Sequence, residues 1–542
     1  MLDDIPVLSL IAFFPLVGVL ALLFMPKQNG RALRIVAMIA TAVPLALSGW
    51  LYAAFKTGEA GLQHEELRKW INIPLNKELT QFNSYYLHFD YHLAVDGLSL
   101  PLVFLTALVA LMALFATVHI KKRFKTFYIL FLLLETGMFG VFLAQDVFLF
   151  FLFFEAALVP VFFLIGIWGY MDREKAANRF LLYNGLGSAV MLIALLILVA
   201  TAGFTVVQAE NGALDIFYSG DLSTIMQNLH DPNAYVNLVP DQMQGSNPFY
   251  MTSTLRWSVF ILLLIGFGIK LPIFPFHTWM LRVHTEAPPS VVMIHSGILL
   301  KMGAYGLIRF GIMIFPEEAK SWAFILALLG VINVLYGAIL AMVQRDFKLV
   351  LAYSSISHMG IVLIGIAAMN EIGLQGAVYQ MVSHGLISAL MFLMVGSLYE
   401  RTGTTMLGDL GGLAKSVPFM SGILLVSGLA SLGLPSLSGF FGEFLSLLGL
   451  FQSKPVLTVI AALGLIFGAV YVLRAVLSIT YGPQPAAFNG MKDARLVEAI
   501  PMIVLVCFIL LLGVYPALLT DPLQHSFDQL LRSAASAAEI GG

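Results

Sequence analysis

About fourteen apolar stretches of roughly 20 residues follow one another along this 542-residue chain. A helix needs about 20 mostly apolar residues to cross the hydrocarbon core of a bilayer. The candidate spans are 5–25, 32–54, 95–118, 126–144, 146–169, 178–203, 256–280, 289–314, 321–343, 347–368, 373–398, 417–450, 456–480 and 498–519. The sequence therefore predicts an all-α polytopic membrane protein with about 14 transmembrane helices.

Composition supports one integral membrane domain over residues 1–542. The chain is 59% hydrophobic and 11% charged, with a mean hydropathy of +0.90, whereas soluble domains are about 25% charged. A net charge of −2 and the lack of a basic block argue against a nucleic-acid partner. A single cysteine, Cys507, excludes an internal disulfide and a multi-cysteine zinc or iron–sulfur site. We expect no metal or cofactor site on this chain.

Basic residues in the connections predict the orientation. The connections on one side, beginning with Lys27, Arg31 and Arg34, hold about twice as many Lys and Arg residues as those on the other. Basic connections face the cytoplasm. We therefore expect both termini on the outer side of a bacterial plasma membrane.

Two of the outer connections, 55–94 and 204–255, are long. Neither shows a recognisable catalytic pattern, so we expect a capping layer or contacts with neighbouring subunits. The N-terminal stretch carries Asp3 and Asp4 where a signal peptide would be basic, which indicates a retained first helix. Residues 521–542 are expected to form a short surface helix or a frayed tail.

Several ionisable residues lie inside the candidate spans. A charged side chain at mid-bilayer costs about 2.5–3.5 kcal/mol on insertion scales, and such residues usually face a polar interior. The set comprises Glu135, Glu155, Lys270, Lys301, His358, His384 and Glu443. Any one of them could be a packing residue, Glu135 and His358 most readily. As a set on separate spans, they indicate a path for protons, because buried Lys and Glu can be tuned by neighbouring charge and His titrates near neutrality.

Prolines predict that two of the spans are broken. Pro272 lacks an amide hydrogen and its ring clashes with the carbonyl of Gly268, so the helix should open around Lys270. Pro275 repeats the disruption one turn later, and Pro435 should open the span 417–450 ahead of Glu443.

Broken helices at matching places in two halves are typical of inverted-repeat transporters. We expect two inverted five-helix repeats, with the first repeat at 121–316 and the second at 317–482. Residues 1–120 would precede them, and helix 14 with its tail would occupy 483–542.

At these residues the chain resembles the antiporter-like M subunits (chain 4) of proton-translocating NADH:quinone oxidoreductase, respiratory complex I. The similarity covers nearly the whole length. It includes DGLSLPLVFLTAL, GVFLAQDVFLFFLFFEAALVPVFFLIGIWG and WMLRVHTEAPPS followed by LLKMGAYGLIRF. The resemblance implies a translocase subunit that couples electron transfer on other subunits to proton pumping.

The resemblance also implies roles for the residues of the first half. Glu155 matches the glutamate that pairs with the lysine at Lys270. Lys301 matches the lysine that links the input of the path to its output.

In the second half, His358 and His384 match the central polar axis, and Glu443 matches the residue near the outer exit. His295 departs from the family, which often has small residues there. It could join a wet path near Lys301, but we expect it to bond a backbone carbonyl.

The resemblance implies that NADH, FMN, iron–sulfur clusters and quinone bind to partner subunits, including neighbouring antiporter-like subunits in the membrane. Two alternative functions remain open. One is a D-type subunit of a multisubunit sodium/proton antiporter, or of a related membrane-bound hydrogenase or dehydrogenase. The other is a membrane scaffold without transport, in which the buried charges only lock helices together.

Overall fold

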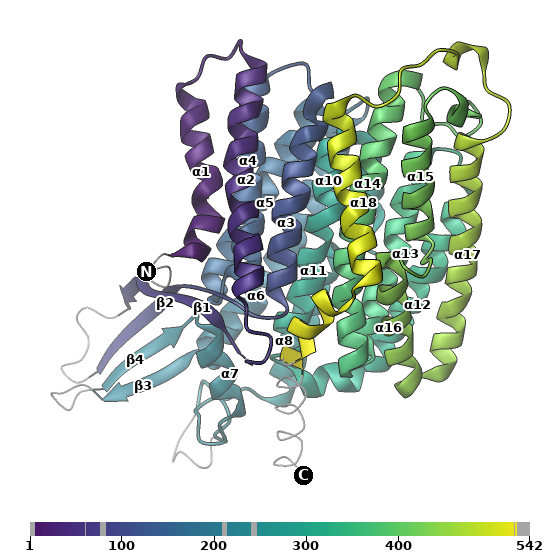
Figure 1. Ribbon diagram of the computed structural model, residues 1–542. Helices are drawn as coiled ribbons and strands as arrows, with labels where there is room; N and C mark the ends of the chain where they lie inside the picture. Colours follow the sequence, from purple (N-terminus) through teal and green to yellow (C-terminus); the bar gives the residue numbers. More distant parts are fainter. Residues whose placement is uncertain are drawn as a thin grey trace.

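The computed structural model describes residues 6–59, 61–75, 83–208, 214–239, 247–524 and 526–527. Long helices run side by side in a bundle, and a small sheet lies at one end of it (Figure 1). In this part of the chain, 13 helical segments are long and apolar enough to cross a membrane. A further crossing is made of two shorter helices, so the expected number of about fourteen is confirmed.

The elements of the first half begin at the edge of the bundle. They are α1 (Val7–Phe24), α2 (Gly30–Ala54), α3 (Ser99–Phe115), α4 (Phe124–Leu143), α5 (Val147–Trp168), α6 (Arg173–Thr201), α7 (Leu222–His230), α8 (Ser253–Lys270), α9 (Thr278–Glu286), α10 (Pro289–Ile294) and α11 (Leu300–Gly306). Two π-helical segments, η3 (His295–Leu299) and η4 (Leu307–Ile312), continue α10 and α11 as one span. Such segments are frequent at functional sites.

The second half completes the bundle. Its helices are α12 (Pro316–Val343), α13 (Phe347–Ala367), α14 (Glu371–Thr402), α15 (Pro418–Ser431), α16 (Ser438–Ser453), α17 (Pro455–Thr480) and α18 (Leu496–Val514). The span from α10 to η4 and helix α14 are buried along their length, and α13 is nearly so. These elements therefore form the centre of the molecule.

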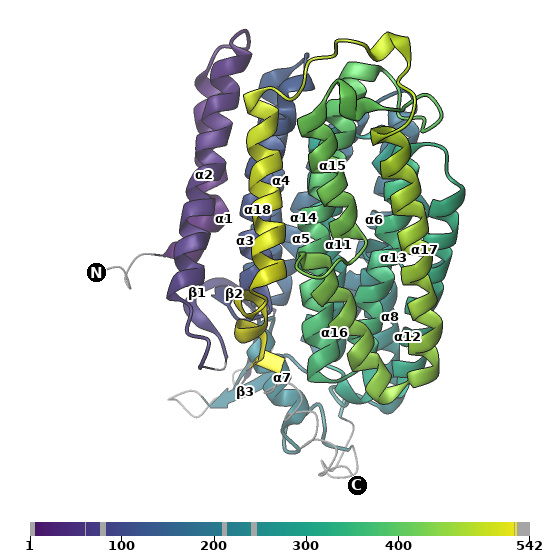
Figure 2. The same ribbon diagram turned by 45° about the vertical axis from the view of Figure 1, so that its right-hand side comes forward.

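Both predicted breaks are confirmed. Helix α8 ends at Lys270, and α9 starts only at Thr278. Helix α15 ends at Ser431 and α16 begins at Ser438, and the two follow one another along one line (Figure 2). At each break a backbone amide bonds a carbonyl five residues earlier, from Ile273 to Gly268 at 2.9 Å and from Leu434 to Leu429 at 3.1 Å. The helix widens there because proline cannot continue the regular ladder.

Asn333 of α12 supports the first break. Its Oδ1 accepts from the amide of Phe274 at 2.8 Å, and its Nδ2 donates to the carbonyl of Pro272 at 3.2 Å. The indole of Trp279 donates to the carbonyl of Ile269 at 3.1 Å. Freed backbone groups at membrane depth persist only where such partners satisfy them.

The two long connections were expected to form a capping layer or to contact other subunits, and together they build one four-stranded sheet. The strands are β1 (Gln63–Pro74), β2 (Asn83–Val95), β3 (Phe204–Gln208) and β4 (Leu214–Ser219). Their order is β1-β2-β4-β3, with β2 and β4 parallel and the other pairs antiparallel. A cap is confirmed, but its strands were not predicted.

A histidine ties the sheet to the helix that follows it. His92 Nδ1 lies 2.7 Å from Oδ1 of Asp221, which caps α7, and His92 Nε2 lies 2.9 Å from Glu65 Oε1 on β1. Burial alone would lower the pKa of His92, but the hydrogen bonds and charges of Asp221 and Glu65 outweigh burial and raise it. We call this cluster the His92 clasp.

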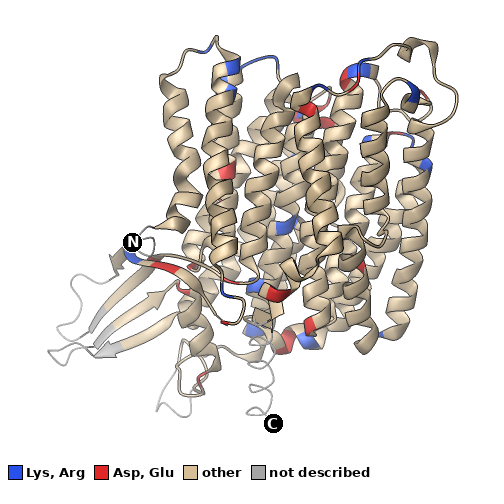
Figure 3. Cartoon of the chain, viewed as in Figure 1, with Lys and Arg blue, Asp and Glu red and all other residues tan. Residues whose placement is uncertain are grey.

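Charged residues gather at the two ends of the bundle, and few lie within it (Figure 3). The start of α1 and the end of α18 both lie at the end that carries the sheet (Figure 1). The basic connections therefore lie at one end of the bundle and the sheet lies at the other, as the charge pattern predicts.

Candidate functional site

Lys301 and His384 meet at the centre of the bundle. Lys301 Nζ lies 2.7 Å from His384 Nδ1 and donates to the carbonyl of Ser296 at 2.5 Å. Ser296 belongs to the π-helical segment η3, which turns this carbonyl toward the lysine. The side chains of Lys301 and His384 are buried, so the contact is shielded from water and from lipid.

His384 leads on to His358. The Nε2 of His384 lies 3.2 Å from Ser355 Oγ, and the two imidazole rings are 5.4 Å apart between centroids. His358 contacts Gln380 through Nδ1 at 3.1 Å and Ser431 through Nε2 at 3.4 Å. Helices α13 and α14 thus hold the two histidines next to the second break.

Glu443 ends this series. Its Oε1 lies 3.4 Å from Nδ1 of His358. Lys301, His384, His358 and Glu443, which were all selected from the sequence, therefore form one connected series across α11, α14, α13 and α16. We call it the central axis.

Small cavities lie along the central axis. One of about 10 Å³ is lined by His384, His358, Ser355 and Ser431 among others, and a second of about 10 Å³ by His358, Glu443, Ser431 and Tyr471 among others. A polar cavity of this size has room for about one water molecule. Glu443 also lines a wider cavity of about 330 Å³ between α16 and α17. The axis therefore has room for water between its side chains and widens at Glu443.

Lys270 lies at the end of α8, and its surroundings differ from the expected ion pair. Its Nζ lies 4.2 Å from the ring centroid of Phe154 and, within the described part of the chain, has no hydrogen-bond partner. No ion pair joins Lys270 to Glu155 among the described residues. The ammonium group instead packs on the ring of Phe154, the residue directly before Glu155.

A second pair of histidines lies near Lys301. His284 Nε2 is 3.0 Å from His295 Nδ1, and both side chains are fully buried. His295 directly precedes Ser296, whose carbonyl accepts the hydrogen bond from Lys301. The other ring nitrogens, Nδ1 of His284 and Nε2 of His295, have no hydrogen-bond partner among the described residues. The expectation that His295 bonds a backbone carbonyl is wrong, because its Nδ1 contacts His284 instead.

His284 was missed by the reasoning from sequence. It lies in the motif WMLRVHTEAPPS, beyond the predicted end of the seventh span at residue 280. Helix α9 continues along α6 after the break, with the ring centroids of Trp279 and Phe180 5.6 Å apart, and it buries His284 inside the bundle. The sequence offered one signal, which is that a second histidine lies 11 residues before His295.

Glu135 lies apart from the central axis. It sits on α4, is fully buried and accepts a hydrogen bond from Thr41 Oγ1 of α2 at 2.6 Å. Its Oε1 has no partner among the described residues. Its contact joins α4 to α2 and, in the described part of the chain, does not extend to Lys270 or Lys301.

A buried ion pair near the sheet was also not singled out from the sequence. Arg309 Nη2 lies 2.7 Å from Asp96 Oδ2, and its Nε donates to the hydroxyl of Tyr305 at 3.2 Å. This pair connects η4 to the segment before α3. The described residues include no group of three His, Cys, Asp or Glu side chains arranged to hold a metal ion.

Paired breaks in a fourteen-crossing bundle, next to a buried line of Lys, His and Glu, define the class of antiporter-like membrane proteins. The family model described as NADH:quinone oxidoreductase/Mrp antiporter, transmembrane, matches residues 144–468. The chain belongs to this family.

Two proteins with similar sequences narrow the class of membrane protein further. The chain is 34% identical to NADH-quinone oxidoreductase subunit M of Rickettsia prowazekii, over 97% of this chain and 99% of that protein. It is 38% identical to NAD(P)H-quinone oxidoreductase chain 4 of Thermosynechococcus vestitus, over 95% and 90%. The resemblance to M subunits and chain 4 proteins is therefore confirmed along almost the full length.

Solved structures agree with the fold. A chain of respiratory complex I from Thermus thermophilus superposes with a TM-score of 0.78 at 29% identity, over 97% of this chain and 99% of that chain. A chain of the Mrp complex from Dietzia gives a TM-score of 0.77 at 18% identity, over 99% of both chains. At that identity, the second match shows a shared fold only.

Proposed function

We propose that this chain is a proton-translocating membrane subunit of an NADH:quinone oxidoreductase. The observation that carries the proposal is the central axis, in which Lys301, His384, His358 and Glu443 succeed one another inside an apolar bundle. Each of these groups can bind and release a proton, and the intervening cavities have room for water. Electron transfer from NADH to quinone would take place on partner subunits, with NADH, FMN, iron–sulfur clusters and quinone bound there.

Glu155 is the proposed receiver of the signal from a neighbouring subunit. It is only partly buried, and the same helix α5 exposes apolar side chains such as Val159 and Phe163. A membrane partner packed on this face would lie next to the carboxylate. A change of charge or hydration there would alter the field at Lys270, because the two already interact through space.

Lys270 then passes its proton toward Lys301. The lysines make no direct contact among the described residues, so a carrier between them is needed. The pair His284–His295 fills this role, since an imidazole can accept a proton on one nitrogen and release one from the other. From Lys301 the proton moves along the central axis to Glu443 and outwards.

The energy required is modest. Moving one charge against 100 mV costs about 2.3 kcal/mol, which corresponds to about a fiftyfold change in the proton affinity of the carrier. Rearranging one charge beside a buried lysine can supply such a change, because interactions are strong at low dielectric. The proposal places both termini on the outer side of a bacterial plasma membrane.

The nearest alternative is a subunit of a sodium/proton antiporter or of another membrane-bound redox complex. A chain of the archaeal membrane-bound sulfane sulfur reductase is 26% identical, with a TM-score of 0.77 over 95% of this chain and 77% of that chain. The relatives at 34% and 38% identity are named as quinone oxidoreductase subunits, which favours the proposal. A scaffold without transport is disfavoured by the continuity of the central axis.

Purification of the complex tests the proposal. A tagged chain should co-purify with subunits that oxidise NADH, and the complex in sealed vesicles should acidify the lumen when NADH and a quinone are supplied. Lys301→Ala should abolish this acidification in an assembled complex, whereas Lys320→Ala, an exposed cation on α12, should leave it unchanged. Sodium uptake without NADH, or pumping by the Lys301→Ala complex, would contradict the proposal.

A further inference from the structure

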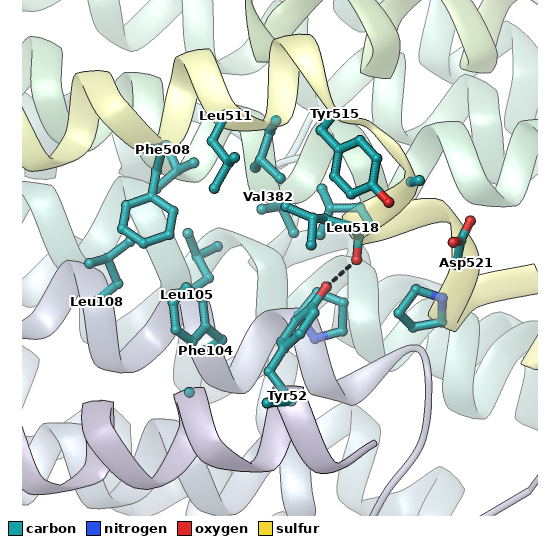
Figure 4. Close-up of a pocket in the computed structure, with 18 of the residues that line it drawn as sticks. Tyr52, Phe104, Leu105, Leu108, Val382, Phe508, Leu511, Tyr515, Leu518 and Asp521 are labelled. Atoms are coloured by element: carbon teal, nitrogen blue, oxygen red, sulfur yellow. Dashed lines mark hydrogen bonds between the residues drawn. The ribbon is translucent and has the colours of Figure 1, made fainter. Parts of the chain in front are cut away.

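A large cavity separates α2 from α18 on the flank of the bundle. Its volume is about 460 Å³, within the range of small-molecule sites in proteins. Helices α3 and α14 form its floor, and the segment after α18 closes the end nearest the sheet (Figure 4). We call it the flank cavity.

The flank cavity is apolar at one end and polar at the other. Phe104, Leu108 and Phe508 line one end of the cavity, and Tyr52, Tyr515 and Asp521 lie toward the other end (Figure 4). The hydroxyl of Tyr52 donates to the carbonyl of Leu518. Tyrosines favour the level of the lipid headgroups, so the polar end lies where the chain leaves the hydrocarbon region.

The shape and chemistry of the flank cavity fit a phospholipid. Water avoids an apolar cavity of this kind, whereas an acyl chain matches its walls. The lining contains the carboxylate of Asp521 and no Lys or Arg. Asp521 forms no ion pair with any described residue and is exposed. Opposite charge attracts an ammonium headgroup and repels an anionic one.

We propose that the flank cavity binds one acyl chain of a zwitterionic phospholipid whose headgroup ends in an ammonium group, such as phosphatidylethanolamine. The ammonium group faces Asp521, and the chain runs between α2 and α18. This inference stands independently of the direction or identity of the transported ion.

The bound chain would support the helix that carries His384. Val382 and Leu386 of α14 line the cavity on either side of this residue in sequence. Leu105 of α3, another lining residue, packs against Gly385. The acyl chain therefore fills space directly behind α14, and its removal leaves that helix free to shift relative to α13.

Photolabelling of the intact complex tests the site. The complex is placed in lipid nanodiscs that contain phosphatidylethanolamine with a photoactivatable acyl chain, and labelled peptides are mapped by mass spectrometry. We expect labelling of peptides that contain Phe104 and Phe508. Excess unlabelled phosphatidylethanolamine should compete at least several-fold better than phosphatidylglycerol.

A filling variant supplies the control. Gly49 lines the cavity, and a Cβ placed there would lie 3.8 Å from the ring of Phe104 with no closer neighbour. Gly49→Phe should therefore fill the space and remove the labelling. Gly422→Phe, on an exposed part of α15 with open space around it, should not.

Asp521→Asn keeps the shape of the site and removes only its charge. It should abolish the preference for the amine headgroup while labelling persists, and it tests the site even if Gly49→Phe fails to assemble. Equal labelling of Gly49→Phe and the unaltered chain would overturn the site. Better competition by phosphatidylglycerol, or cross-linking of a neighbouring subunit into the cavity, would overturn the proposed occupant.

Discussion

His284 Nε2 lies 3.0 Å from His295 Nδ1, and this contact joins two helices that the first break separates from α8. His295 directly precedes Ser296, whose carbonyl accepts the hydrogen bond from Lys301. In the proposed function the pair links Lys270 to the central axis, which makes the series of protonatable groups longer than the sequence alone indicated.

Replacing either histidine should slow proton transfer between the lysines. We expect His284→Phe and His295→Leu each to reduce NADH-driven pumping with the complex still assembled. Because the two act as one unit, the double variant should be no slower than the worse single variant. Rates of acidification in vesicles measure this, and additive losses would show that the histidines act separately.

Lys270→Ala should suppress pumping and leave the complex intact. The ammonium group of Lys270 has no hydrogen-bond partner among the described residues. Its removal therefore breaks no hydrogen bond with any of them. Acidification per NADH oxidised is the measurement, with Lys320→Ala as the matched exposed control. Glu155→Ala should give a similar loss, and normal pumping by an assembled Lys270→Ala complex would remove its central role.

Glu443→Gln should block release at the end of the central axis. The amide keeps the size of the side chain and its contact with His358, but it cannot bind and release a proton. Removing one member of a buried charged pair can cost about 3–5 kcal/mol, so Glu443→Ala would confuse folding with transfer. Pumping should be lost in Glu443→Gln and partly retained in Glu443→Asp. Equal pumping by the unaltered, Glu443→Gln and Glu443→Asp complexes would place the exit of the proton path elsewhere.

Glu135→Gln should have a smaller effect. Glu135 bonds Thr41 on a peripheral helix, and glutamine can still accept that bond. We expect a milder loss of pumping than in the Lys270→Ala complex, because no contact joins Glu135 to the central axis among the described residues. A loss as large as that of Lys270→Ala would place Glu135 in the path.

The His92 clasp should make the sheet sensitive to pH. The pKa of His92 is raised in the folded chain. The contribution of His92 to stability is therefore fully present below the ordinary pKa of about 6.5. The contribution is lost as the pH rises through the raised pKa. Hydrogen exchange of β1 and α7 should therefore speed up, beyond the intrinsic increase, on the alkaline side. His92→Gln should remove this pH dependence of hydrogen exchange. An identical pH profile in that variant would show that the His92 clasp does not cause it.

The helices and their breaks could be predicted because their causes are local. Apolar runs of membrane length and the prolines at 272 and 435 act through neighbouring backbone atoms. The sheet was missed because the parallel pair of β2 and β4, which joins its two halves, spans more than a hundred residues. The antiparallel pairs β1–β2 and β3–β4 are local in sequence. Strictly alternating apolar and polar residues in 87–93, within β2, offered a signal that was not used.

The central axis was predicted as a set of residues, but not its contacts. Burial of ionisable groups can be inferred from their position in an apolar run. The packing of Lys270 on Phe154 and the burial of His284 on α9 depend on side chains from other helices. Those arrangements follow from tertiary structure, which no local pattern encodes.

The parallel pairing of β2 with β4 has a consequence for biogenesis. Four membrane helices, α3 to α6, separate β2 from β3, so β2 is synthesised well before its partner β4. Until β4 pairs with it, that edge of β2 remains open, and an open strand edge is prone to wrong associations. The sheet can close only when α3 to α6 have crossed the membrane so that β2 and β4 lie on the same side.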